Sequence, residues 1–366
     1  MLTTEPLAPD YAGGSVANLS AELELRLAGA TPGIPLKDDL AALIPDAHTY
    51  IVVLFDGLGD HQLGHPSATT LLASRRGTID AVFPTTTSVN LASFATAFAP
   101  IRHGLIAHQL FMHGTVVNTL KWKTVGGDPV AFDPRTVLPS PNLWERLTAA
   151  GVEPITVQPG AFESSPLSRA MYRGCRFEPA WSYEDLVNAT AQLATGPKRL
   201  IFAYVPNVDV AAHVYGLASA EYTEAIKIAD SVWSLAAARL PAGAVMIGIA
   251  DHGLVDYPES AKISLRRPKG LQYYGDPRGV LVRGPVPLAE KLAGTVPATW
   301  VPIDTLRTWW GPEPAHHDLQ RRSPVGALVP DRDHVLLPSG MDSRMIGYHG
   351  GLDEREVKVP LLVSGG

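Results

Sequence analysis

Four short runs of apolar, largely β-branched residues constrain most strongly how this chain can fold. They span residues 49–55, 153–157, 200–205 and 244–249. Each run is apolar at consecutive positions, which is typical of strands that helices bury on both faces. Helical patterns lie at residues 17–27, 141–150, 183–193 and 220–240. This alternation predicts an α/β fold with a central, mostly parallel sheet flanked by helices.

The region from 257 to 338 differs in texture from the rest. Proline is frequent there, and the basic residues Arg266, Arg267 and Lys269 cluster in a segment that we interpret as solvated surface. We therefore expect two domains. A catalytic α/β domain comprises residues 1–256 plus 339–366, and a smaller α+β insertion lobe comprises residues 257–338.

Composition excludes several classes of protein. The 366 residues are 46% hydrophobic and 18% charged, which excludes wholesale disorder. A formal charge of −6 argues against binding to a nucleic-acid duplex, and the apolar runs are too short for a membrane partner. The first residues lack the pattern of a signal peptide, so we expect a cytoplasmic protein. The sequence does not indicate the oligomeric state.

Cys175 is the single cysteine, which leaves no disulfide framework and no thiolate metal cluster. Any metal site must therefore use His, Asp and Glu.

Acidic and histidine residues follow three of the four strand-like runs. They are Asp56 after the first run, Asp209 and His213 after the third, and Asp251 and His252 after the fourth. Ligands of open α/β sheets bind outside the carboxyl ends of the strands, so these side chains should converge. Singly, each has an ordinary interpretation as a turn, a surface pair or a loop. Their recurrence favours a site for Zn²⁺, Mn²⁺ or Mg²⁺.

Two further segments carry candidate chemistry. Three threonines, Thr85 to Thr87, precede an apolar helical pattern. They are either an N-cap cluster or the site of a hydroxyl nucleophile beside a phosphate bound at the helix N-terminus. His349 is flanked by glycines, which would let it approach a metal without crowding.

Other motifs are absent or weak. The chain has no GxSxG, Walker A or HExxH motif. His316, His317 and Asp318 could suggest a helical phosphohydrolase, but their proline-rich surroundings favour a surface loop.

The motifs occur in an order that resembles the alkaline phosphatase superfamily. They read FDG, FPTTTSVN, PIRHG, VDVAAH, ADHG and YHGGLDEREVKVPLLV. Within that superfamily the chain is most similar to the type I phosphodiesterase/nucleotide pyrophosphatase family, over roughly residues 50–362.

The resemblance implies an alkaline-phosphatase-like fold and two divalent metal ions, with zinc first and manganese as the alternative. One ion would be held by Asp56, Asp251 and His252 together with the nucleophile Thr87. The other would be held by Asp209, His213 and His349. Thr87 lies three residues after Pro84, as in the family, and Thr86 is the alternative nucleophile. His108 stands where family members have a phosphate-binding Asn, so it is the candidate substrate contact.

The implied function is a phosphodiesterase or nucleotide pyrophosphatase that acts through a phosphothreonine on a small phosphorylated substrate, such as a nucleotide. A phosphomonoesterase, a phosphonate hydrolase and a non-catalytic phosphate-binding protein are the alternatives. The insertion lobe should cover the site, with Tyr273, Tyr274 and Trp309 as candidate aromatic walls or as packing within the lobe.

Overall fold

Two seven-stranded sheets form the framework of the chain. The computed structural model describes residues 7–196, 198–338 and 341–366. Residues 1–6, 197 and 339–340, which fall in the predicted catalytic domain, lie outside the described residues. Within the described part, no helix combines the length and apolar character that crossing a membrane requires.

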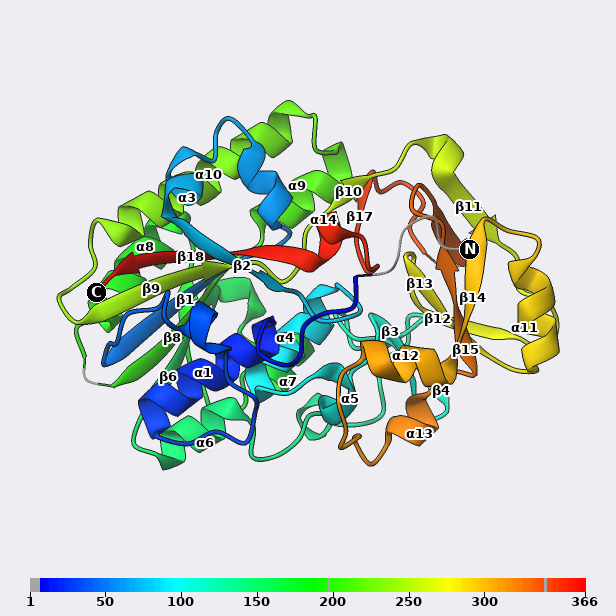
Figure 1. Cartoon of the computed structure of the whole chain (residues 1–366), viewed down its shortest axis with the longest axis horizontal. Coiled ribbons are helices and arrows are strands. Elements are labelled where there is room, and N and C mark those ends of the chain that lie inside the picture. Colours follow the sequence, from blue (N-terminus) through cyan, green and yellow to red (C-terminus); the bar gives the residue numbers. More distant parts are fainter. Residues whose placement is uncertain (1–6, 197, 339–340) are drawn as a thin grey trace.

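The first sheet runs through the left half of Figure 1 in the order β2-β18-β9-β1-β8-β6-β7. The five strands β9, β1, β8, β6 and β7 pair in parallel with their neighbours in this order. Strand β18 is antiparallel to both of its neighbours, β2 and β9. Its strands are β1 (Thr49–Phe55), β2 (Arg75–Asp80), β6 (Glu153–Pro159), β7 (Arg176–Ala180), β8 (Arg199–Val205), β9 (Ala244–Ile249) and β18 (Lys358–Gly365). The prediction of a mostly parallel sheet with helices on its faces is confirmed.

Two helical layers cover this sheet (Figure 1). One layer comprises α1 (Val16–Ala28), α4 (Thr87–Thr96), α6 (Leu143–Ala149) and α7 (Pro166–Met171). The other comprises α3 (Thr69–Ser74), α8 (Tyr183–Leu193), α9 (Asn207–Tyr215) and α10 (Ala220–Ala237). Covered on both sides, β1 and β9 are buried at every position, which explains why their sequences are continuously apolar.

Local sequence explains where individual helices begin. Asn142 caps α6: its side chain accepts a hydrogen bond from the Glu145 amide at 2.9 Å, and the Glu145 carboxylate accepts one from the Asn142 amide at 2.8 Å. This reciprocal capping box satisfies two amides that the helix itself leaves unpaired.

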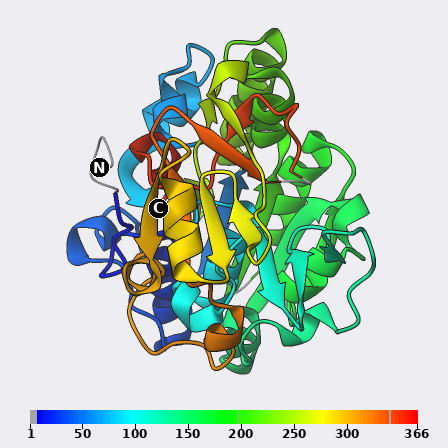
Figure 2. The ribbon, with the colours of Figure 1, turned by 90° about the vertical axis from the view of Figure 1, so that its right-hand side faces the viewer.

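The second sheet is antiparallel and has the order β14-β15-β13-β12-β3-β4-β5. Figure 2 faces it. Its strands are β3 (Gln109–Met112), β4 (Thr115–Asn118), β5 (Lys123–Thr124), β12 (Gln272–Asp276), β13 (Gly279–Arg283), β14 (Ala298–Pro302) and β15 (Gly326–Pro330). Strands β3 to β5 come from outside the predicted insertion, so the second sheet is built from two distant segments. The division into two domains remains a prediction.

Short elements make up the rest of the secondary structure in the described chain. The strands are β10 (Val255–Asp256) with β17 (Gly347–Tyr348), and β11 (Lys262–Leu265) with β16 (Val335–Pro338). The helices are α2 (Asp38–Ala41), α5 (Pro100–His103), α11 (Val286–Ala293), α12 (Ile303–Trp309), α13 (Leu319–Arg322) and α14 (Glu354–Val357). The 3-10 turns are η1 (Asp60–Gly64), η2 (Pro134–Thr136), η3 (Gly160–Phe162) and η4 (Glu259–Ala261).

Candidate active site

The register of the parallel strands brings the strand-end residues together. Leu54 pairs with Ile249, so the positions two residues further on, Asp56 and Asp251, leave the same edge of the sheet side by side. The Gly57 amide donates a hydrogen bond to Asp251 Oδ1 at 3.1 Å, which ties the two strand ends to each other.

Gly57 also allows the third strand end to approach. Its φ is +76°, and a Cβ at this position would lie 2.9 Å from both Cα and Cβ of Asp209. The Asp209 amide donates to the Asp56 carbonyl at 3.0 Å. Any other residue at position 57 would therefore push α9, which carries Asp209 and His213, away from β1.

Asp56, Asp251 and His252 form a buried group, called here the inner group. His252 Nε2 lies 3.6 Å from Asp56 Oδ1 and 3.4 Å from Asp251 Oδ2. Neither of these carboxylate oxygens has a hydrogen-bond partner among the described residues. Burial, followed by the charges of Asp251 and Asp209, raises the pKa of Asp56 well above its usual range. Two crowded carboxylates, each with one unpartnered oxygen, fit a bound cation.

Asp209, His213 and His349 form a second, half-buried group, called here the outer group. His213 Nε2 lies 3.1 Å from Asp209 Oδ1, and His349 Nε2 lies 3.8 Å from the same oxygen. Burial raises the pKa of Asp209, but the charge and hydrogen bond of His213 outweigh it and leave that pKa below its usual range. Asp209 in turn raises the pKa of His213 against the effect of burial.

The imidazoles of the outer group are oriented by backbone carbonyls. His213 Nδ1 lies 2.7 Å from the Gly347 oxygen, and His349 Nδ1 lies 2.7 Å from the Thr85 oxygen. A carbonyl only accepts, so in the neutral rings each Nδ1 carries the proton and each Nε2 presents a lone pair. The two Nε2 atoms are 3.2 Å apart. Two facing lone pairs fit a shared cation, and the carbonyl contacts are those that commonly orient metal-binding histidines.

The two groups form one continuous cluster. The rings of His252 and His349 stack with centroids 3.6 Å apart and planes 13° apart. Burial and the neighbouring His252 and His213 lower the pKa of His349 well below its usual range, so it is neutral as a metal ligand must be. All six predicted carboxylate and imidazole ligands are thus brought together; that they bind metal remains a prediction.

Thr87 is the first residue of α4, and its Oγ1 lies 3.2 Å from His252 Nε2. Thr86 is the N-cap residue of that helix. The Thr85 hydroxyl donates to the Gly351 carbonyl and accepts from the Gly350 amide, both at 3.0 Å, which holds the nucleophile segment against the His349 loop. Of the three threonines, Thr87 is therefore the one whose hydroxyl contacts the cluster.

His108 lies half-buried between the two sheets. Its Nε2 is 3.0 Å from Asn118 Nδ2, and its amide donates to Asp276 Oδ2 at 3.3 Å. Burial, with the charges of His213 and Lys121, lowers the pKa of His108 to about 4. The ring is therefore neutral at pH 7. Its predicted contact with substrate stays a prediction.

Sequence reasoning missed two residues of this region. Tyr204, one residue before the end of β8, donates its hydroxyl hydrogen bond to Asp56 Oδ2. Asp276, at the end of β12, is buried against the His108 amide and Gly350, and burial raises its pKa to about 7. The position of Tyr204 near the carboxyl end of a buried, strand-like run could have predicted that it lies at the site. Nothing in the sequence around Asp276 points to the site.

The candidate aromatic walls do not line the site. Tyr273, Tyr274 and Trp309 are at most 9% exposed. Trp309 packs edge-on against Phe83, with ring centroids 5.4 Å apart. They are core residues because each ring is covered by neighbouring strands and helices.

The His316–His317–Asp318 segment lies apart from the cluster. Its ligating atoms lie within 4.8 Å of one another, but Asp318 already pairs with Arg321 and Arg322. The side chain of His317 is 81% exposed. This agrees with the expected surface position, as does the exposure of Arg266, Arg267 and Lys269.

Comparison with known proteins adds a family and a fold. Residues 50–275 match the family described as type I phosphodiesterase/nucleotide pyrophosphatase. No curated protein matches the chain.

Similar solved structures include murine ectonucleotide pyrophosphatase/phosphodiesterase 5, with 18% identity over 87% of this chain and 88% of that chain, and a TM-score of 0.68. An inactive variant of the murine protein in complex with AMP has 18% identity over 86% and 87% of the two chains, and a TM-score of 0.67. Phosphonoacetate hydrolase from Sinorhizobium meliloti 1021, in complex with phosphonoacetate, has 16% identity over 88% and 91%, and a TM-score of 0.64. At these identities the solved structures show a shared fold.

Proposed function

The chain belongs to the type I phosphodiesterase/nucleotide pyrophosphatase family and is a hydrolase of phosphoester or pyrophosphate bonds; from this premise we propose that Thr87 is its nucleophile. The observation that carries the proposal is the position of Thr87 Oγ1, at the start of α4 and 3.2 Å from His252 Nε2. The helix N-terminus adds partial positive charge where a phosphate would sit.

The six clustered side chains would hold the metal. Three are carboxylates and three are imidazoles, a donor set that suits zinc, with manganese as the alternative. When bound, two such ions would supply positive charge that favours the ionised Thr87 hydroxyl and offsets the charge of the phosphate. When ionised, as metal ligands must be, the three carboxylates carry three negative charges, so the site needs these cations before it can accept an anion.

The residues then define the reaction. Thr87 Oγ forms a bond to phosphorus while the bond from phosphorus to the leaving oxygen breaks, and that oxygen keeps the electron pair and takes a proton from solvent. Water then forms a bond to phosphorus while the bond from phosphorus to Thr87 Oγ breaks. The water gives a proton to solvent and Oγ takes one up, which restores the Thr87 hydroxyl. Tyr204 holds Asp56 in place, and Thr85 holds the segment that bears the nucleophile against the His349 loop.

The substrate in this proposal is a small phosphorylated compound such as a nucleotide. The murine relative was solved with AMP and the bacterial one with phosphonoacetate, both small phosphorylated or phosphonylated ligands. The second of these supports keeping phosphonate hydrolysis as the alternative function. Cytoplasmic location remains a prediction.

Trapping the covalent intermediate tests the proposal. The metal-loaded protein is mixed with bis-p-nitrophenyl phosphate and quenched in acid, and the peptide that contains residues 85–87 is sequenced by mass spectrometry. Only one p-nitrophenolate leaves in the first step, so we expect a p-nitrophenyl phosphoryl group on Thr87. Thr87→Ala should abolish both the label and the turnover. The matched control, Thr86→Ala, should retain both. Label on Thr86 would contradict the assignment.

Substrate profiling separates the alternatives. Equal amounts of the protein are assayed with bis-p-nitrophenyl phosphate, p-nitrophenyl phosphate and phosphonoacetate. A preference for the diester supports the proposed activity, whereas a preference for the monoester or the phosphonate supports the corresponding alternative. Absence of turnover with every substrate, in protein shown to contain metal, would favour a non-catalytic phosphate-binding protein.

A further inference from the structure

Asn118, the last residue of β4, holds the ring of His108 in one orientation. Its Nδ2 atom lies 3.0 Å from His108 Nε2. Its Oδ1 atom accepts hydrogen bonds from the amides of Leu120 at 3.1 Å and Lys121 at 2.9 Å. An amide nitrogen could not accept these two bonds, so the oxygen must face the backbone and the NH2 group must face the ring.

This contact determines which ring nitrogen of His108 carries the proton. The Asn118 NH2 group only donates, so His108 Nε2 has to accept with its lone pair. In the neutral ring the proton is then on Nδ1. None of the described residues hydrogen-bonds Nδ1, and this atom is not one of the fully buried polar atoms that lack a partner. The Nδ1–H group is therefore accessible to a ligand.

The two histidines of the outer group have the opposite arrangement. Carbonyl oxygens accept from the Nδ1 atoms of His213 and His349, which leaves the Nε2 lone pairs for a cation. In His108 the Nε2 lone pair is occupied and the N–H group is free. Burial, and then the charge of His213, lowers the pKa of His108, so the ring lies near the outer group. A protonated nitrogen donates to an anion but does not ligate a metal, so His108 suits a phosphate oxygen.

The backbone of His108 is fixed by two other residues of the region around the second sheet. Asp276, at the end of β12, accepts from the His108 amide at 3.3 Å. On the other side, the amide and the hydroxyl of Thr119 both donate to the His108 carbonyl at 2.8 Å. Because its main chain is held at both ends, the residue loses little conformational freedom when a ligand binds to its ring.

We propose that Asn118 is a positioning residue: it fixes His108 as a hydrogen-bond donor, through Nδ1, to an oxygen of the phosphate bound at the cluster. The inference rests on the proposed function, since it assumes that a phosphate group binds there. Asn118 does not touch the phosphate in this arrangement and acts only through the ring of His108.

The substitution Asn118→Asp isolates this role, because it replaces only the NH2 group by an oxygen. The oxygen that accepts from Leu120 and Lys121 is kept, and Asp suits such a turn as well as Asn, so the fold should be retained. The new oxygen accepts, so the neutral ring of His108 should carry its proton on Nε2 and leave a lone pair at Nδ1. Measurement at about pH 8 keeps the ring neutral although the new carboxylate raises its pKa.

Nitrogen-15 NMR of the imidazole rings in the zinc-loaded protein tests the tautomer. The signals of His108 are those that His108→Asn lacks. We expect a protonated Nδ1 and an unprotonated Nε2 in wild type, and the reverse in Asn118→Asp. A wild-type ring with its proton on Nε2 would overturn the proposal, whatever the activity of the protein.

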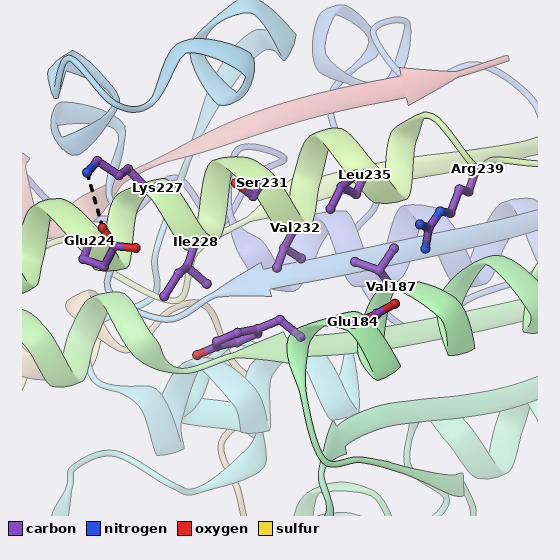
Figure 3. A pocket seen from close by; sticks show the side chains of 10 residues that line it. Glu184, Val187, Glu224, Lys227, Ile228, Ser231, Val232, Leu235 and Arg239 are labelled. Carbon is purple, nitrogen blue, oxygen red and sulfur yellow. Dashed lines mark hydrogen bonds and ion pairs between the residues drawn. The ribbon is translucent and has the colours of Figure 1, made fainter.

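Binding of inorganic phosphate, measured by calorimetry on the same proteins, tests the consequence. Loss of a hydrogen bond to a charged group should weaken binding by about 10- to 100-fold in Asn118→Asp. Gln109 pairs with Asn118 across β3 and β4, so Gln109→Glu adds the same charge nearby and should weaken binding much less. A distant control is Asn188→Asp, beside Arg239 of the groove between α8 and α10 in Figure 3, which should leave binding unchanged.

The His108→Asn background separates positioning from a structural role. An Asn side chain at 108 offers its own NH2 group, so the residue at 118 no longer selects a tautomer. In this background, Asn118→Asp should cost no more phosphate affinity than Gln109→Glu does. A larger loss that persists there would overturn the proposal. Wild-type phosphate affinity in Asn118→Asp, despite the inverted tautomer, would overturn it as well.

The proposed function and this inference can fail separately, because neither measurement needs turnover. A protein that binds phosphate as expected but hydrolyses none of the tested substrates would contradict the proposed function and leave the role of Asn118 standing. A wild type that hydrolyses bis-p-nitrophenyl phosphate but has the other tautomer of His108 would do the reverse. A zinc-loaded wild type that binds no phosphate would also overturn the inference.

Discussion

The inner and outer groups of the candidate metal cluster differ in how the fold positions them. The inner group, Asp56, Asp251 and His252, follows two adjacent parallel strands, and its side chains are at most 5% exposed. The outer group takes Asp209 and His213 from one helix and His349 from a loop, and its side chains are 13 to 16% exposed. Sheet register therefore arranges the first group, whereas packing between distant segments arranges the second.

The charge balance of the two groups also differs. The inner group places two carboxylates beside one imidazole, and the pKa of Asp56 is raised by burial and by like charge. The outer group places one carboxylate beside two imidazoles, and the pKa of Asp209 is lowered. Without metal, repulsion is thus concentrated in the inner group. We expect an ion bound there to matter more for the fold and to exchange more slowly than one bound in the outer group.

The largest expected effect is the loss of an inner ligand. Asp251→Asn should lower kcat/KM by more than about 100-fold, which is the upper end for removing a group that merely orients a ligand. Asp251 is buried, and the neutral amide oxygen of Asn lacks the charge of the carboxylate ligand. Activity and metal content by mass spectrometry, before and after addition of zinc, measure the effect. Recovery of activity with excess zinc would contradict the expected difference in metal binding between the inner and outer groups.

Loss of an outer ligand should be milder. His213→Ala should lower activity at limiting metal, and added zinc should restore it to within about tenfold of wild type, because Asp209 and His349 remain and solvent can complete the coordination. A zinc titration of activity measures this. His61→Ala, which removes an exposed histidine outside the cluster, is the control and should behave as wild type. A variant that zinc fails to rescue would contradict the expected tolerance of the outer group.

The orienting hydroxyl of Tyr204 should have a smaller effect. Tyr204→Phe keeps the buried ring but removes the hydrogen bond to Asp56, so metal affinity should fall by about 10-fold. Competition with a chelator of known affinity measures the change. If the metal affinity of the outer group falls and that of the inner group does not, the Tyr204 hydroxyl does not act through its hydrogen bond to Asp56.

The smallest expected effect is on stability, and it has opposite signs in the two groups. In chelated protein, Asp56 with its raised pKa keeps a proton that the unfolded chain has lost, so its contribution is greatest at low pH and falls as pH rises above the usual carboxyl pKa. Asp209, with its lowered pKa, contributes above the usual carboxyl pKa and loses that contribution as pH falls through the pKa of the folded state.

Urea unfolding of chelated Asp56→Asn and Asp209→Asn between about pH 2 and about pH 7 tests these signs. Relative to wild type, Asp56→Asn should gain stability by on the order of 1 kcal/mol as pH rises from about 4 to about 7. Asp209→Asn should lose stability by a similar amount as pH rises from about 2 to about 4, and should change little above that range. If the stability of the two variants changed with pH in the same way, the expected electrostatic difference between the inner and outer groups would be wrong.

Much of the fold follows from local patterns in the sequence. The buried strand β1 matches its apolar run at residues 49–55, and α8 matches the helical pattern at 183–193. Both could be predicted because the spacing of apolar residues along the chain follows the period of the element and the faces that it buries. The strand-end ligands could be found for a related reason. Carboxyl ends of parallel strands share one edge, so a sequence that places acids after several such strands implies their meeting.

The rest depended on contacts between residues far apart in the chain. His213 and His349 meet across 136 positions, and Tyr204 reaches Asp56 across 148. Strands β3 to β5 join a sheet whose other members begin more than a hundred residues later.

Aromatic residues show the same limit most clearly. Tyr274 is fully buried, while Trp181 is 77% exposed. Both are large apolar residues, and local sequence does not distinguish them. Hydrophobicity states what a side chain gains by burial, but only the packing of the other elements decides whether a partner surface is present to bury it. The sequence by itself therefore determined the main sheet and the chemistry at its edge, and the tertiary structure decided the pairing of the ligands and the surface beside them.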